Sequence, residues 1–356
     1  MLLVSEPVFV FCLTLFCCGL ILATKRHHIL RTAKGHNGSA VQSAHKLPTP
    51  RIGGVAIALG LTFGSFAFWD QSPFVLILLL STLPVFIGGL GEDLGFDVSP
   101  KKRLLLSFLS ALTAGLSLGV WIPYVGLSGI DFLLTNVVFA AVFTMLISGG
   151  ISHSLNLIDG LNGLALGVSI AMGLGLIAIS YLYQDWDMLR FLSVFVAALA
   201  GLFVVNFPFG KLFLGDAGAY SLGHLLTWSG IVLLNRHEDL APFSLFLVFF
   251  WPVADMLFAI TRRRLTGKRI DQPDRLHFHQ LVMRALEMKF LDKSKRHISN
   301  PLATLIVLPL ASAPIIVGVL YSTNNLIGIV ALACFAVLFW LTYLLGVTLA
   351  KRFAKT

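Results

Sequence analysis

Residues 241–260 read APFSLFLVFFWPVADMLFAI, and residues 261–270 read TRRRLTGKRI. The first stretch has the length that a helix needs to cross roughly 30 Å of hydrocarbon. The second stretch places a cluster of cations directly after it, as at a membrane surface. Apolar stretches of this kind recur along the chain. With 57% hydrophobic and 12% charged residues, the composition lies far outside the range of soluble proteins.

The apolar stretches predict an all-α, polytopic integral membrane protein with about eleven transmembrane helices, in a single domain over residues 1–356. No connection is long enough to form a separate soluble domain. The predicted spans are 2–23, 52–69, 73–91, 104–122, 132–151, 161–183, 190–208, 217–235, 241–260, 301–321 and 325–349.

Cations are distributed unevenly between these spans. Of the 26 Lys and Arg residues, 24 lie in alternate connections or in the C-terminal tail, and only Arg190 and Arg236 lie on the other side. Because cytoplasmic loops carry the excess of Lys and Arg, the N-terminus is expected outside and the C-terminus in the cytoplasm. The net charge of +9 then reflects orientation, and no nucleic-acid binding is expected. The connections predicted to be cytoplasmic are about 24–51, 91–103, 152–163, 209–219 and 261–300.

Acidic residues gather in these same connections. Glu92 and Asp93 are adjacent, and adjacent carboxylates repel unless a cation joins them. Magnesium favours such oxygen ligands together with substrate phosphates. Ser99-Pro100 predicts the capped start of a helix, whose free N–H groups attract anions. An ordinary charged turn is the alternative.

Two further connections carry isolated acids. Asn156, Asp159 and Asn162 recur at every third position, so in a helical turn they would share one side. Such groups can bind sugar hydroxyls, a nucleobase or metal-bound water, whereas the alternative is that Asp159 only caps a helix. Asp216, flanked by Gly215 and a second nearby glycine, is expected to be either a magnesium ligand or the cap of the next span.

The first cytoplasmic connection ends in His45-Lys46-Leu47-Pro48-Thr49-Pro50-Arg51-Ile52-Gly53-Gly54. Its two prolines stiffen the chain, and the glycine pair allows another backbone or a ligand to approach closely. The alternative is that the segment is only a basic end of a membrane span, followed by a glycine pair that packs against another helix. This alternative explains the glycines, but it explains His45 and Arg51 less well.

The connection at 261–300 contains Arg275, His277 and His279. In an extended segment these side chains would share one edge, which suits a pyrophosphate; in a helix the two histidines would diverge. Zinc binding and a plain surface loop are the alternatives. The apolar residues at 281–290 have helical spacing, which predicts a helix lying on the membrane. Asp255, an acid within a span, is expected either to pair with a nearby arginine or to face the site.

Five segments in this order resemble the polyprenyl-phosphate N-acetylhexosamine-1-phosphate transferases. They are HKLPTPRIGG (45–54), GLGEDL with SPKKRL (89–104), NLIDGLNG (156–163), FLGDAGAYSLG (213–223) and PDRLHFHQ (273–280). The usual Asp-Asp pair of that family appears here as Glu92-Asp93, and the second Asp of its DGxDG segment as Asn162. Gln280 replaces a third histidine, which argues against the peptidoglycan branch and favours one acting on surface-polysaccharide precursors.

The resemblance implies transfer of a sugar-1-phosphate from a UDP-N-acetylhexosamine to undecaprenyl phosphate, with release of UMP, at the bacterial inner membrane. It implies Mg²⁺, with Mn²⁺ as the alternative ion, and membrane lipid as a partner; a homodimer is compatible with the sequence. A multispan transporter or flippase of lipid-linked sugars is the competing function. The implied roles are catalysis for Glu92, Asp93 and Asp159, metal binding for Asp216 and Asp93, and substrate binding for His45, Arg51, Asn156, Arg275, His277 and His279.

Overall fold

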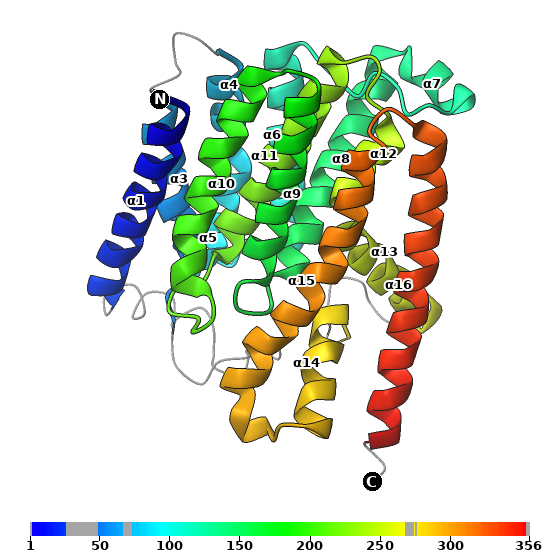
Figure 1. The fold of residues 1–356 in the computed structure, drawn as a ribbon. Helices are drawn as coiled ribbons and strands as arrows, with labels where there is room; N and C mark the ends of the chain where they lie inside the picture. Colours follow the sequence, from blue (N-terminus) through cyan, green and yellow to red (C-terminus); the bar gives the residue numbers. More distant parts are fainter. Residues whose placement is uncertain (1, 26–48, 67–72, 268–273, 275, 354–356) are drawn as a thin grey trace.

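A computed structural model describes residues 2–25, 49–66, 73–267, 274 and 276–353. Over these residues the chain forms helices and no strands, which confirms the all-α prediction. The long helices stand side by side in one bundle (Figure 1). The helices are α1 (Leu2–Ala23), α3 (Gly53–Ser65), α4 (Pro73–Ser81), α5 (Leu83–Asp93), α6 (Pro100–Leu118), α7 (Ser128–Leu134), α8 (Val137–Ile158), α9 (Leu164–Leu182), α10 (Trp186–Asn206), α11 (Gly215–Arg236), α12 (Pro242–Phe246), η2 (Leu247–Phe249), α13 (Phe250–Leu265), α14 (Phe278–Lys289), η3 (Lys293–Lys295), α15 (Arg296–Leu320) and α16 (Asn325–Phe353).

Nine helical segments within the described ranges are long and apolar enough to cross a membrane. Two of them are composite, since α4 continues into α5 and α12 continues through η2 into α13. The two other predicted ranges contain the shorter α3 and the more charged α6. Every predicted range therefore holds a helix, while the number of helices that cross the bilayer stays a prediction.

The predicted span at 132–151 was wrong at both ends. The helix begins only at Val137, because the Asn136 side chain accepts hydrogen bonds from the N–H groups of Val138 and Phe139 and so caps it. It then continues to Ile158 through a segment rich in serine and glycine, because the small residues there are buried against neighbouring helices. Asn156 is consequently on the last turn of α8 and not in a loop.

Helix α11 occupies the centre of the bundle. It is buried from Gly215 to Leu234 and packs against α3, α5, α8 and α9. Around it, α1 packs on α3 and α10, while α14 lies against α15 and α16 (Figure 1). The residues at the first turn of α11 are therefore surrounded by the ends of several other helices.

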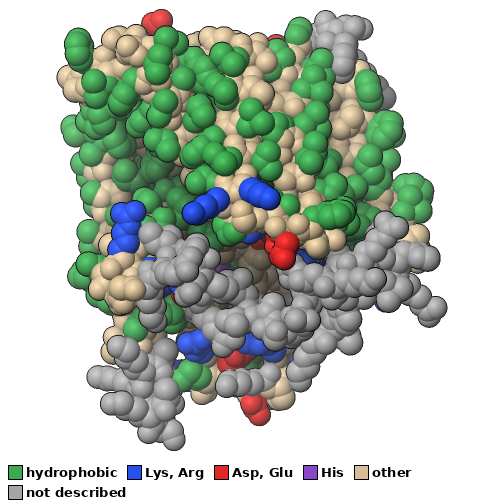
Figure 2. Space-filling model, turned by 180° about the vertical axis from the view of Figure 1, so that it is seen from behind, with side chains coloured by type: hydrophobic (Ala, Val, Ile, Leu, Met, Phe, Trp, Pro, Cys, Tyr) green, Lys and Arg blue, Asp and Glu red, His purple; other side chains and the backbone are tan. Residues whose placement is uncertain are grey.

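The two ends of the bundle differ in charge. On the face shown in Figure 2, hydrophobic side chains cover the upper part, and most charged side chains gather at the lower end. At the opposite end Arg190 pairs with Glu6, and Arg236 pairs with Asp185 at 2.9 Å. Helix α1 begins at one end and α16 finishes at the other, as an odd number of spans requires (Figure 1). Which end faces the cytoplasm stays a prediction.

Candidate active site

The first turn of α11 gathers acids from two other connections. Asp93 Oδ1 accepts a hydrogen bond from the Asp216 N–H group, and Asp93 Oδ2 accepts one from the Ala217 N–H group, both at 2.9 Å. Asp159 accepts a hydrogen bond from the Gly215 N–H group. The first N–H groups of a helix have no partner within it and form the positive end of its dipole. Three acids that are distant in sequence therefore meet at one helix end.

The Asp216 side chain does not cap α11, as one alternative had proposed, because it lies inside the first turn. Its carboxylate pairs with the guanidinium of Arg103 and lies 3.6 Å from Nη2 of Arg51. The Asn156 amide donates to Asp216 Oδ1 at 3.0 Å. The carboxylate is nearly buried, with a side-chain exposure of 8%. Asp216 is thus the acid on which cationic and polar side chains converge.

The carboxylates at this helix end lie close together and are partly or fully buried, so their negative charges repel one another. Burial raises the pKa of Asp159 to about 7; Arg51 partly offsets this shift, and Asp216 adds to it. Glu92, half-buried beside Asp93, interacts electrostatically with Arg103. A bound cation would relieve this repulsion, and so the arrangement suits a cation site.

Backbone contacts fix the segment before α3 against the segment before α11. The N–H groups of Gly53 and Gly54 donate to the carbonyl oxygens of Phe213 and Leu214, each at 2.8 Å. A Cβ atom on Gly54 would lie 2.6 Å from Cα of Gly218, which is backbone and cannot move aside. The predicted close approach at the glycine pair is confirmed. It also holds Arg51 beside Asp216.

Gly54→Ala should separate α3 from α11. Overpacking a tight contact costs about 1–3 kcal/mol, and the displaced Arg51 should lower activity by about tenfold or more. A thermal unfolding scan and a turnover assay on purified protein measure both effects. Gly19→Ala is the control, because nothing lies within 4 Å of a Cβ atom at that glycine. Equal stability and turnover in the two variants would contradict the packing argument.

His277 and His279 meet around Asp255. His277 Nδ1 lies 3.2 Å from Asp255 Oδ2, the His279 Nδ1 lies 3.7 Å from the same oxygen, and the two rings stack with centroids 5.8 Å apart. Asp255 Oδ1 also accepts a hydrogen bond from the Phe278 N–H group at the start of α14. The undecided role of Asp255 is thereby resolved, since it pairs with histidines and not with the arginines that follow it.

The predicted extended segment was wrong from Phe278 onward, because α14 begins there and His277 precedes it in an extended conformation. The two imidazoles nevertheless share one side, since His277 is extended and precedes the helix, so helical periodicity does not fix its direction, and both rings lie near Asp255 Oδ2. Burial opposes protonation of both rings. For His277 the hydrogen bond with Asp255 and the negative charges of Asp255 and Asp274 together outweigh burial and raise the pKa, whereas burial dominates and lowers the pKa of His279.

His279 connects this pair to the acid loop. A Cβ atom on Gly160 would lie 2.6 Å from His279 Nε2, so the ring lies against the residue that follows Asp159. Neither nitrogen of His279 has a hydrogen-bond partner among the described residues. His45 and Arg275, predicted to bind substrate with these histidines, lie outside the described residues.

Asn162 does not share one side with Asn156 and Asp159, because α8 has ended before it. Its amide donates to the Pro208 carbonyl oxygen at 2.7 Å, and its N–H group donates to Asn300 Oδ1 at 2.8 Å. Asn162 therefore ties α15 to the bundle. The prediction of three polar side chains on one helical face was wrong for this residue.

Comparison with known proteins gives a consistent answer. Residues 75–234 match the family model described as glycosyl transferase family 4. The chain is 29% identical over 248 residues to a probable undecaprenyl-phosphate N-acetylglucosaminyl 1-phosphate transferase of Bacillus subtilis, covering 68% of each chain. It is 28% identical over 273 residues to a decaprenyl-phosphate N-acetylglucosaminephosphotransferase of Mycobacterium leprae, again covering 68% of each. These matches support the polyprenyl-phosphate N-acetylhexosamine-1-phosphate transferase family that the sequence motifs resemble.

More distant branches match as well. The phospho-N-acetylmuramoyl-pentapeptide-transferase of Staphylococcus saprophyticus is 28% identical over 255 residues, which cover 66% of this chain and 77% of that protein. The family model ends at residue 234, two residues before the end of α11, so it includes Asp93, Asp159 and Asp216 but not the histidines. The predicted family is confirmed, and the three acids lie inside the matched region.

The acids at the first turn of α11 fit the magnesium that the resemblance implies. Mg²⁺ usually takes one or two protein carboxylates and completes its shell with waters and substrate phosphates. Within the described residues no group of three His, Cys, Asp or Glu side chains is arranged to hold a metal. Asp216 already attracts two guanidinium groups, and Asp93 touches the same turn. Asp216 and Asp93 would therefore hold the ion.

Two residues at this site, Arg103 and Tyr220, were not predicted from the sequence. Arg103 was counted only as a loop cation, yet it pairs with Asp216, and its guanidinium lies 5.9 Å from the centre of the Tyr220 ring. Tyr220 follows Asp216 by four residues, so helical periodicity could have placed both on one face. Arg103 follows the Ser99 cap by four residues, which puts it at the end of the first turn of α6, directed toward the site.

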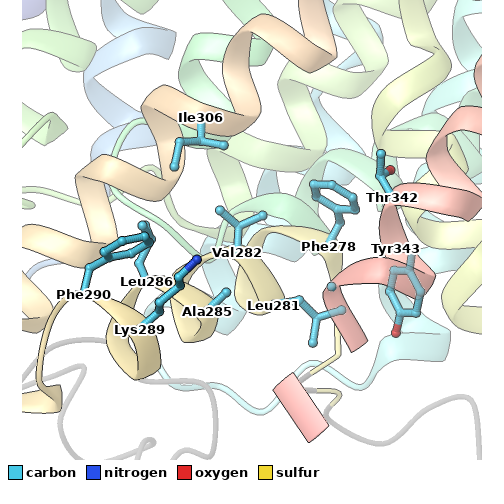
Figure 3. A pocket seen from close by; sticks show the side chains of 11 residues that line it. Phe278, Leu281, Val282, Ala285, Leu286, Lys289, Phe290, Ile306, Thr342 and Tyr343 are labelled. Carbon is cyan, nitrogen blue, oxygen red and sulfur yellow. The ribbon is translucent and has the colours of Figure 1, made fainter. Parts of the chain in front are cut away.

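An apolar cavity of about 280 Å³ lies apart from the acids, between α14, α15 and α16 (Figure 3). Its lining is almost entirely hydrocarbon, with Lys289 as the one charged residue. Such a lining suits a hydrocarbon chain but not a nucleotide or a phosphate. The first turn of α11, in contrast, offers charged and hydrogen-bonding side chains.

Proposed function

We propose that this protein transfers an N-acetylhexosamine-1-phosphate from a UDP-sugar to undecaprenyl phosphate, with release of UMP. The reaction would be the first membrane step in the synthesis of a cell-surface polysaccharide such as O-antigen, capsule or exopolysaccharide. The names of the relatives, which include undecaprenyl- and decaprenyl-phosphate transferases, support the lipid acceptor. The observation that carries the proposal is the meeting of Asp93, Asp159 and Asp216 beside Arg51 and Arg103.

Both substrates are anions, so charge is the main obstacle to their reaction. A phosphate oxygen of the lipid attacks the phosphorus that carries the sugar, a new P–O bond forms, and the bond to the UMP oxygen breaks. Bound Mg²⁺ supplies a positive charge that offsets the charge of both phosphates. Arg51 and Arg103 add cationic donors on the same side, and Asn156 holds the Asp216 carboxylate in place through its amide.

The geometry favours direct attack over a covalent aspartyl intermediate. Both oxygens of Asp93 already accept hydrogen bonds from α11. These two hydrogen bonds fix the orientation of the Asp93 carboxylate and make its oxygens weaker nucleophiles, which suits a ligand of a cation better than a group that attacks phosphorus. A phosphate monoester has a second pKa of about 6, so the lipid phosphate needs little help from a base at neutral pH. We therefore assign Glu92, Asp93 and Asp159 mainly to orientation and cation binding.

His277 and His279 are proposed to position the site as well as to approach the pyrophosphate. Both are buried, at 3% and 1% exposure, and they join the start of α14 to Asp255 and Gly160. In the proposed complex Nε2 of His279, which lies against Gly160, makes a hydrogen bond to the loop that carries Asp159 or to substrate.

A lipid-linked sugar transporter or flippase is the competing function. Transporters place ionisable residues and broken helices near the membrane midplane. Here the centre is occupied by α11, which is buried over nearly its whole length, and most charged pairs lie at the two ends of the bundle. This arrangement favours chemistry at one surface over passage through the bundle.

A panel of UDP-sugars tests the proposal. The purified protein in nanodiscs with undecaprenyl phosphate and Mg²⁺ should release UMP from at least one UDP-N-acetylhexosamine and form a lipid-linked sugar diphosphate. The sugar with the highest kcat/KM identifies the donor, which the chain does not reveal. If no UDP-N-acetylhexosamine yields UMP, the transferase proposal is wrong.

The proposed cytoplasmic placement makes a separate prediction. In a cysteine-free background, Lys293→Cys should resist an impermeant thiol reagent added to intact cells, because it follows α14 at the cation-rich end. Glu238→Cys, exposed at the opposite end, should be labelled readily. The reverse pattern would show that the orientation is inverted.

A further inference from the structure

Arg103 occupies the position that a metal ion on Asp216 requires. Its Nη1 pairs with Asp216 Oδ2, while the other oxygen of that carboxylate receives the Asn156 amide and faces Arg51. Both oxygens of the carboxylate are therefore engaged without any ion. A divalent cation and a guanidinium repel each other, so each weakens the binding of the other to one carboxylate.

The rest of the Arg103 side chain is only partly satisfied. Its Nε is buried and has no hydrogen-bond acceptor among the described residues. A buried donor of this kind costs free energy until an acceptor reaches it. The Arg103 guanidinium of α6 also lies over the ring of Tyr220 of α11, and this cation–π contact stabilises its position. Arg103 is thus held at the site with donors still available.

We propose that Arg103 is an internal cation that competes with the divalent ion for Asp216 and moves to a substrate phosphate when the ion binds. This inference rests on the proposed function, because the phosphate is that of the lipid or of the nucleotide sugar. The guanidinium fork matches a phosphate better than a single carboxylate oxygen does. The exchange keeps the Asp216 carboxylate neutralised before the substrate arrives and supplies a phosphate ligand afterwards.

The inference distinguishes Arg103 from a residue that only stabilises the fold. Removing a residue that holds Asp216 in place should weaken metal binding, whereas removing a competitor should strengthen it. The same removal should slow turnover, because the phosphate loses a ligand. Tighter metal binding together with slower turnover is the combination that a structural role does not produce.

Mn²⁺ binding to the substrate-free, full-length protein is measured by loss of the free-ion signal in electron paramagnetic resonance. Arg103→Ala should bind Mn²⁺ about tenfold more tightly than wild type, within the usual range of coupling between sites. UMP release by the same variant should fall by about 100-fold. Arg103→Lys should keep an affinity within about threefold of wild type but release UMP about tenfold more slowly, because its ammonium lacks the fork.

Lys102→Ala is the matched control. It removes the same charge from the same helical turn, its side chain is exposed, and the Ser99 cap to its N–H group is retained. Both its affinity for Mn²⁺ and its turnover should stay within about twofold of wild type. If Arg103→Ala does not purify folded, Arg103→Gln is used instead, since it also lacks the charge and has the same expected increase in affinity.

The outcomes are separable. Unchanged or weaker Mn²⁺ binding in Arg103→Ala, with active wild type, overturns the competition and leaves the transferase proposal standing. Full turnover in Arg103→Ala overturns the transfer of the guanidinium to phosphate. If wild type itself releases no UMP, the proposed function fails, and the Mn²⁺ comparison still decides whether Arg103 competes for Asp216.

Discussion

Asp216→Asn should reduce UMP release by about 1000-fold or more while the protein stays folded. The substitution keeps the shape of the side chain and an oxygen that can accept the Asn156 amide. It removes the negative charge that pairs with Arg103 and faces Arg51, and with it the proposed main ligand for a divalent ion. Turnover at saturating UDP-sugar, followed with the variant at matched protein concentration, measures the effect.

Asp97→Asn is the control for this variant. Asp97 is exposed in the loop between α5 and α6 and has a φ of 55°, a conformation that Asn also tolerates. Its turnover should match that of wild type. A variant at residue 216 that keeps more than about a tenth of wild-type turnover would remove Asp216 from the role assigned to it.

Asp255→Asn should have the next largest effect, through the docking of α14. The Asp255 carboxylate is 2% exposed and holds His277, His279 and the first N–H group of α14. Losing one partner of a buried charged pair costs about 3–5 kcal/mol. We expect α14 to loosen, the His279 ring to leave Gly160, and UMP release to fall by about 100-fold.

Limited proteolysis between α14 and α15 reports the loosening directly, because a detached helix is cleaved faster. Asp292→Asn makes the same chemical change at an exposed position after the far end of α14 and should be cleaved like wild type. Equal cleavage of the two variants, with equal turnover, would show that the buried histidine–carboxylate pairs do not hold the helix.

The sequence predicted best those helices whose bounds depend on the length of an apolar stretch or on a capping residue next to it. Helix α1 matches the predicted range, and α6 begins at the Ser99-Pro100 pair because the Ser99 hydroxyl accepts from the Lys102 N–H group. The close approach at Gly53 and Gly54 was also predicted, since only glycine lets two backbones touch. These features depend on a few neighbouring residues.

The errors arose where tertiary contacts override local pattern. Helix α8 continues to Ile158 because its polar lower half is buried in the bundle, which hydropathy does not show. Asn162 was grouped with Asp159 by its spacing, but its partners are distant in sequence: Pro208 follows α10, and Asn300 lies in α15. His277 and His279 meet because Asp255 pairs with both, and that contact spans 22 residues.

The sequence predicted the acids of the candidate site and the nearby Arg51, but it did not predict Arg103. Asp93, Asp159 and Asp216 do meet, as expected from their placement in connections on one side. That Asp93 and Asp159 cap α11, and that Arg103 pairs with Asp216, depends on how four helix ends pack together. Sequence spacing carries no information on such packing.

The central claim is that Asp216, at the first turn of α11, holds a divalent ion against a substrate phosphate. Locating Mn²⁺ by anomalous scattering in crystals grown with UDP-N-acetylglucosamine tests it most directly. We predict one ion bound by an Asp216 oxygen and a substrate phosphate oxygen at about 2.1–2.2 Å, with Asp93 beside it. An ion bound away from the first turn of α11, or an Asp216 still paired with Arg103 and Arg51 when Mn²⁺ and substrate are bound, would contradict it.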